Sequence, residues 1–301
     1  MSALAGATSI AYRRRASPLH AARGTIAAAY GLSIALAALL LGNPILLGAL
    51  LVAVLAAAAG AGVLRPLLLA TRVSGPIVLI TCIVVNAFVS HYGLTVLARL
   101  GNWGVLGEVD PTLEAIVYGA VVGLRLLIVT FACLLVVCAA NPQDLLRACR
   151  RVSPHSALTA AIASRLVSVL AADARRLADA QRCRPQIDPS RRRARLAILR
   201  ATLTGAFDRS LDIAAMLEMR GYAAAGRALP SRRPHSRHDL AFALGALAML
   251  ALALAFALSG DAAFDAYPLI SIDTGPLVLL GAALLAGLAL LPFLNRRGVE
   301  T

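Results

Sequence analysis

Long apolar runs dominate the chain and are separated by short polar segments. Six runs reach or approach the roughly 20 residues that a helix needs to cross a bilayer. The expected spans cover about 25–42, 44–64, 75–97, 112–139, 240–259 and 275–294. The pattern predicts an all-α, polytopic helical membrane protein. Its expected parts are a four-span membrane region (1–139), a polar helical region (140–238), and two further spans with a short tail (239–301).

The distribution of charge predicts the orientation of these spans. The net charge is +14, and all 29 basic residues are arginines. With both termini in the cytoplasm, every arginine except Arg99 and Arg125 lies on the cytoplasmic side. We therefore expect a multi-pass protein of the plasma (inner) membrane. Because such proteins gather arginine at their cytoplasmic face, the charge does not indicate a nucleic-acid partner.

The polar region between the fourth and fifth spans has apolar residues at helical spacing. A short helix is expected from about Asn141, and a longer one from Pro154 to Arg184. A third should run from about Arg191 to Arg220, where the following glycine ends it.

Both long helices are expected to end with an arginine on their apolar stripe. Arg184 follows Leu177 by seven residues, and Arg220 follows Ile213 by seven. Seven residues are nearly two helical turns, so each arginine lies close to the stripe. This placement suits insertion of a charged tip into a groove on another protein. The alternative is simple interaction with the helix dipole, worth about 0.3–1 kcal/mol.

Two short motifs resemble those of the transmembrane T component of energy-coupling factor (ECF) transporters, the EcfT/CbiQ-like family. The family carries Ala-Arg-Gly-type motifs at the ends of cytoplasmic coupling helices. The second motif is matched by Glu218-Met219-Arg220-Gly221-Tyr222. The first is matched by Ala180-Gln181-Arg182-Cys183-Arg184-Pro185, in which Cys183 replaces the usual Ala and Pro185 the usual Gly. The segment Asn141-Pro142-Gln143-Asp144-Leu145-Leu146 also resembles the family's entry into the coupling region.

The resemblance implies an ABC-type importer of vitamins or transition-metal ions. In that family the T component joins two cytoplasmic ABC ATPase subunits to a membrane substrate-binding S component. The motif arginines dock in grooves of the ATPases, a role that falls here on Arg184 and Arg220. The adjoining motif positions Cys183, Pro185, Met219 and Gly221 are expected to share that contact.

Polar residues inside the spans are few. Arg125 lies within the fourth span, where a charge costs about 2.5 kcal/mol or more and indicates a functional role by default. The alternative is an arginine that snorkels or pairs with a buried carbonyl. Asn86 in the third span is expected to hold helices together.

Other function classes find less support. A lipid transferase would need an acidic metal site, but Asp208 and Asp212 lack a second acidic pair nearby. A permease with its own substrate site would need more intramembrane polar groups than Arg125 and Asn86. Without lysine the chain has no Walker A motif, so any ATP hydrolysis belongs to partner subunits. The five cysteines show no metal-ligand spacing. We expect a non-catalytic protein with no cofactor and no metal.

Overall fold

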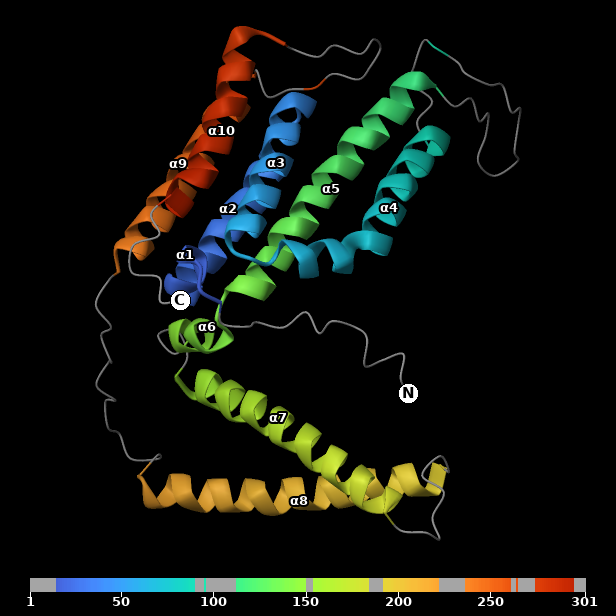
Figure 1. Ribbon diagram of the computed structural model, residues 1–301, viewed down its shortest axis with the longest axis vertical. Helices are drawn as coiled ribbons and strands as arrows, with labels where there is room; N and C mark the ends of the chain where they lie inside the picture. Colours follow the sequence, from blue (N-terminus) through green and yellow to red (C-terminus); the bar gives the residue numbers. More distant parts are fainter. Residues whose placement is uncertain are drawn as a thin grey trace. The chain divides into compact units, whose positions relative to one another are not determined.

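The computed structural model describes residues 15–89, 95, 112–149, 154–183, 192–221, 236–260, 264 and 274–294. These residues form ten helices and separate into two compact units (Figure 1). The first, here called the membrane unit, contains Met1–Leu145 and His235–Thr301. The second, here called the helical insert, contains Leu146–Pro234. The chain is therefore an all-α, polytopic membrane protein, as its sequence predicts.

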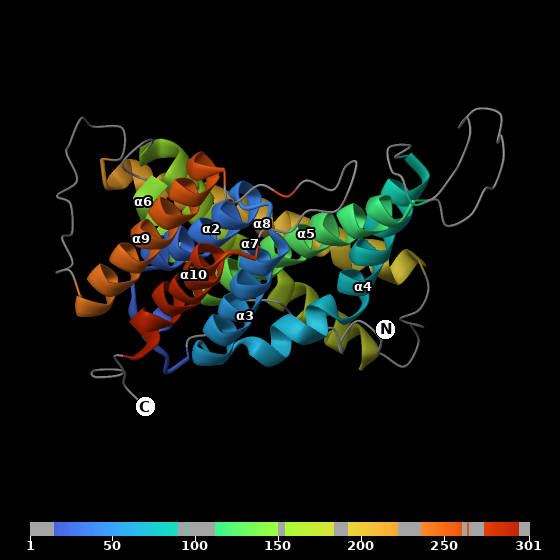
Figure 2. The same ribbon diagram turned by 90° about the horizontal axis from the view of Figure 1, so that it is seen from above.

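Within the membrane unit, apolar helices pack side by side. They are α1 (Pro18–Ala21), α2 (Gly24–Leu40), α3 (Pro44–Gly60), α4 (Leu64–Val89), α5 (Leu113–Ala139), α9 (Arg237–Ser259) and α10 (Pro276–Leu294). Helix α2 contacts α5 and α9, while α3 contacts α10 and α5. Helix α4 packs mainly on α5 and lies at the opposite side of the unit from α9 and α10 (Figure 2).

Four described helices are long and apolar enough to cross a membrane, namely α4, α5, α9 and α10. Helices α2 and α3 are equally apolar but have 17 residues each. At 1.5 Å per residue, each is about 26 Å long, close to the roughly 30 Å thickness of a bilayer core.

Helix α4 differs from the expected third span because it begins eleven residues earlier, at Leu64 rather than 75. Gly75, the expected start, and Pro76 both lie inside the helix. Proline lacks an N–H and its ring clashes with the preceding turn, so it kinks a helix rather than always ending it. Figure 1 shows the resulting change of direction along α4.

An aromatic cluster joins three helices in the buried core of the membrane unit. Tyr30 of α2, Phe242 of α9 and Phe293 of α10 meet edge to face, with ring centroids 5.1–6.2 Å apart. The Tyr30 hydroxyl donates a hydrogen bond to the Ala289 carbonyl at 2.7 Å. Because the phenol is fully buried, this bond satisfies a hydroxyl that has no access to water.

Small residues bring α4 and α5 into close contact. A Cβ atom at Gly119 would lie 2.8 Å from the Ile83 Cα, and one at Gly123 would lie 3.3 Å from the Leu79 Cα. The two glycines are four residues apart, which is the small-xxx-small spacing of packed membrane helices. Sequence analysis missed this pair, although the Gly119-x-x-x-Gly123 spacing is readable from the chain.

Candidate coupling site

The helical insert contains two long helices, α7 (Pro154–Arg182) and α8 (Arg192–Met219), which contact each other. The short α6 (Pro142–Cys149) precedes them. Mostly exposed side chains cover both long helices.

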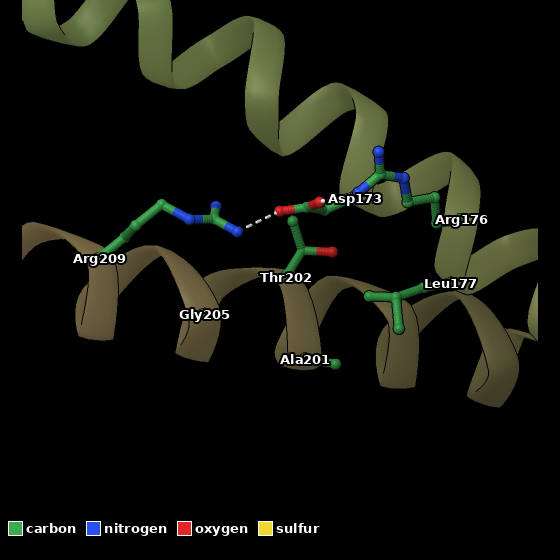
Figure 3. A pocket seen from close by; sticks show the side chains of 7 residues that line it. All are labelled: Asp173, Arg176, Leu177, Ala201, Thr202, Gly205 and Arg209. Carbon is green, nitrogen blue, oxygen red and sulfur yellow. Dashed lines mark hydrogen bonds and ion pairs between the residues drawn. The ribbon is translucent and has the colours of Figure 1, made fainter.

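An ion pair joins the two long helices. Asp173 of α7 accepts a hydrogen bond from Arg209 Nη2 of α8 at 2.6 Å, and Arg176 lies 3.7 Å from the same carboxylate (Figure 3). The two side chains of the main pair are 24% and 40% exposed, so water screens the interaction in part. The sequence alone did not identify Asp173, because one acid among many arginines carries no positional signal.

The surroundings of this pair form an open pocket of about 280 Å³. Its lining residues are Asp173, Arg176, Leu177, Ala201, Thr202, Gly205 and Arg209. Going along α7 from Asp173 to Leu177, the facing residues of α8 run from Arg209 back to Ala201. The two helices are therefore antiparallel here (Figure 3).

The end of α8 presents the second motif at the surface. Met219 is 80% exposed, and Arg220 and Gly221 are exposed as well. Gly221 has φ +69°, the left-handed conformation that glycine adopts without strain, and its N–H bonds to the Glu218 carbonyl. The helix therefore ends where the glycine predicts, with an unburied methionine and arginine at its tip.

The end of α7 is described only in part. Cys183 is exposed and directly follows the helix. Arg184 and Pro185, the remaining residues of the first motif, lie outside the described residues. In the sequence, Arg184 stands eleven residues after Asp173, which is the same distance as Arg220 after Arg209.

One side of α8 carries a row of exposed apolar side chains at spacings of three and four residues. They are Leu196, Leu199, Leu203 and Phe207, each between 48% and 69% exposed. Residues at this spacing share one face of a helix. A continuous exposed apolar face of this kind marks an interaction surface in proteins.

The intramembrane polar residues are bonded within the chain. Arg125 Nη2 donates to the Leu41 carbonyl at 3.0 Å, and Asn86 Nδ2 donates to the Cys82 carbonyl in its own helix at 2.8 Å. Asn86 makes an intrahelical bond and also lies at the contact of α4 with α5, because a Cβ atom at Gly119 would be 3.1 Å from the Asn86 Cβ. Asp208 and Asp212 are exposed on α8, and the described part of the chain holds no group of three metal-ligating side chains.

Comparison with known protein families identifies the chain. Residues 15–232 match the model of the family described as CbiQ, cobalt transport protein. The chain belongs to the CbiQ family. The match covers α1 to α8, and so includes both the membrane helices up to α5 and the helical insert; α9 and α10 follow it. No curated protein matches the chain. The family assignment makes this protein a transport protein of the membrane.

Proposed function

We propose that this CbiQ-family protein is the transmembrane T subunit of an ECF-type ABC importer for a vitamin or a transition-metal ion. Two ABC ATPases bind the arginine tips of α7 and α8, and a membrane S subunit holds the substrate. The chain itself has no catalytic role, and it transmits motion from the ATPases to the membrane. The exposed Met219-Arg220-Gly221 end of α8, in a member of a transport family, carries this proposal.

The chemistry of the tip supports docking on a protein. A guanidinium group offers a planar fork that pairs bidentately with carboxylates. Met219 adds a flexible apolar side chain, which adapts well to a partner's groove. An 80% exposed methionine beside an exposed arginine gains nothing within its own unit, whereas a partner would cover both.

The exposed apolar row on α8 supports an assembly as well. Leu196 to Phe207 would stay in water if the insert acted alone, and burial against a partner removes that cost of about 25 cal/mol per Å². The insert therefore has two kinds of surface for partners, namely the arginine tips and the apolar row on α8.

We further propose six spans in the plasma (inner) membrane, with both termini and the insert in the cytoplasm. Helices α2 and α3, with 17 residues each, lie at the short end of the range for crossing a bilayer. A small local thinning of the bilayer accommodates this length. The excess of arginine on one side of the spans supports the orientation.

The experiment is purification of the tagged chain, co-expressed with its neighbouring genes, from membranes in mild detergent. Two ATPase subunits and a small membrane protein should accompany the wild type. Arg184→Ala with Arg220→Ala should lower the ATPase yield at least about tenfold, because truncating one side of a desolvated charge pair strands the other. Arg165→Ala with Arg175→Ala is the matched control, since both arginines are exposed on α7 but lie away from its tip and from the apolar row of α8.

Retention of the ATPases by the Arg184/Arg220 double variant at the wild-type level would contradict the proposal. An equal loss of ATPases in the control pair would contradict it too. It would show that removing any two exposed arginines weakens the complex. Membrane insertion should remain unchanged in both pairs, which equal amounts of chain in the membrane fraction would confirm.

A further inference from the structure

The start of α2 is held by two carboxylates that lie at opposite ends of the helical insert in the sequence. Asp144 comes just before the insert, and Asp239 comes just after it. Asp239 accepts a hydrogen bond from the Arg23 backbone N–H at 2.8 Å, and Asp144 accepts one from the Gly24 N–H at 3.4 Å. The N–H groups of two consecutive residues thus bind carboxylates that are 95 residues apart in the sequence.

The Asp239 side is a buried and well-satisfied site. The carboxylate is 3% exposed, and its second oxygen lies 3.2 Å from Arg23 Nε and accepts the Ser236 N–H at 3.0 Å. Ser236 returns a bond by accepting the Asp239 N–H, which completes a capping box at the start of α9. One carboxylate therefore caps its own helix and binds the first turn of another.

The Asp144 side depends on the absence of a side chain. A Cβ atom at Gly24 would lie 2.7 Å from the Asn141 carbonyl oxygen and 2.9 Å from its nitrogen. Both atoms belong to the backbone, so any larger residue would push the start of α6 away from α2. Glycine at this position allows the Asp144 carboxylate to reach the helix.

The sequence of α2 leaves room for these external partners. Its N-cap residue, Arg23, makes no side-chain hydrogen bond to the helix, and its first turn contains no acid. Free N–H groups and the helix dipole make a helix N-terminus favourable for negative charge. Asp144 and Asp239 supply what the helix itself lacks.

Resting on the function proposed above, we propose that Asp144 and Asp239 form a clamp through which movement of the insert reaches the membrane helices. Both chain connections to the insert are fixed to residues 23 and 24, so displacement at either end acts on α2. Helix α2 in turn packs on α5 and α9. The two acids are positioning residues, which couple the insert to the bundle without contacting substrate or nucleotide.

The test uses the intact transporter complex and does not require the substrate to be known. Hydrogen–deuterium exchange of the amides at the start of α2 is measured without nucleotide and after trapping with ATP and vanadate. In the wild type, trapping should change this exchange by about fivefold or more. In Asp144→Ala with Asp239→Ala, which removes both acceptors, the change should disappear, while ATPase content and ATP hydrolysis stay within about twofold of the wild type.

Two further variants separate the clamp from helix capping and from loss of folding. Ser236→Ala removes the cap of α9 but keeps the bonds to Arg23, so the nucleotide response should survive. Gly24→Ala keeps both acids but separates α6 from α2, so the response should fall. Should the double variant fail to fold, Asp144→Ala alone must show the loss.

The outcomes distinguish this inference from the proposed function. Absence of ATPases from the wild-type complex contradicts the proposed function. An intact complex whose α2 response is the same in the wild type and the clamp variants contradicts the clamp alone. A response lost equally in Ser236→Ala also overturns it, because capping would then explain the effect.

Discussion

Arg125 of α5 completes the end of α2 by donating a hydrogen bond to the Leu41 carbonyl, 3.0 Å from Nη2. The carbonyl is one of the last of α2, which have no partner within the helix. A positive charge at this end of a helix also interacts favourably with its dipole.

This relationship predicts a structural effect for Arg125→Ala. The substitution should lower the stability of the detergent-purified protein by about 0.5–2 kcal/mol, the range of polar contacts between membrane helices. Thermal unfolding followed by fluorescence measures the change. Leu126→Ala is the control, because its partly exposed side chain makes no such bond. Unchanged stability together with lost transport would instead assign Arg125 a direct functional role.

Gly119 predicts a test of the contact between α4 and α5. Gly119→Val would place atoms within 3 Å of the Ile83 Cα and the Cys82 carbonyl, which are backbone atoms and cannot move aside alone. We expect a loss of about 1–3 kcal/mol in thermal unfolding, the usual cost of overpacking. Gly48→Val is the matched control, since nothing lies within 4 Å of its Cβ position. That variant should be neutral or slightly stabilising. Equal effects at both positions would contradict the packing argument.

Tyr30→Phe tests the buried hydroxyl at the aromatic cluster. The variant keeps the ring contacts with Phe242 and Phe293 but leaves the Ala289 carbonyl without its donor. The expected loss in a chemical or thermal unfolding experiment is about 0.5–1.5 kcal/mol. Tyr30→Ala should cost more, about 3–5 kcal/mol, because it also opens a cavity. A smaller loss for Tyr30→Ala than for Tyr30→Phe would be inconsistent with this cluster.

The Asp173–Arg209 pair should contribute little to stability despite its short distance. A double-mutant cycle with Asp173→Asn and Arg209→Gln should give a coupling energy of about 0.2–1 kcal/mol, because both side chains are partly exposed. The exposed pair Asp179–Arg182 within α7 serves as the reference. A coupling well above this range would show that the pair is more shielded from water than its exposure indicates.

His20 predicts a dependence of stability on pH. Burial lowers the pKa of this imidazole and the positive charge of Arg15 lowers it further, against a backbone hydrogen bond with Cys138 that raises it. The folded protein therefore favours the neutral ring, which lies 2.6 Å from the Ser17 hydroxyl. The stabilisation is complete above the ordinary value of 6.5 and declines as the pH falls below it.

Melting temperatures between pH 8 and about pH 5 test this behaviour. The wild type should lose stability toward acid more steeply than His20→Asn, which has no proton to gain. Parallel curves for the two proteins would assign the pH dependence to other groups.

Much of the fold could be predicted because apolar runs and helix breakers act locally. Gly221 ends α8 as expected, and Pro154 begins α7. The start of α4 was predicted eleven residues late, at about 75 instead of Leu64, and Pro76 lies inside the helix, where a proline can produce a kink.

The partners of individual side chains could not be predicted. The Leu41 carbonyl bonded to Arg125 and the Arg23 amide bonded to Asp239 are backbone groups, which have no signature in the sequence. Glycines were read as turn signals or ignored, whereas Gly24 and Gly119 permit close approach of another backbone. The exposure of Met219 likewise depends on tertiary structure.

The bonds of α2 to later segments have a consequence for biogenesis. This helix leaves the ribosome early, yet the hydrogen bond of its Tyr30 hydroxyl can form only after Ala289 is synthesised, 259 residues downstream. The hydrogen bond to the Leu41 carbonyl requires Arg125 of α5, and the bond from the Arg23 amide requires Asp239 of α9. Translation therefore completes the bonding of α2 last, and a nascent chain truncated before α10 would lack the acceptor of the Tyr30 hydroxyl.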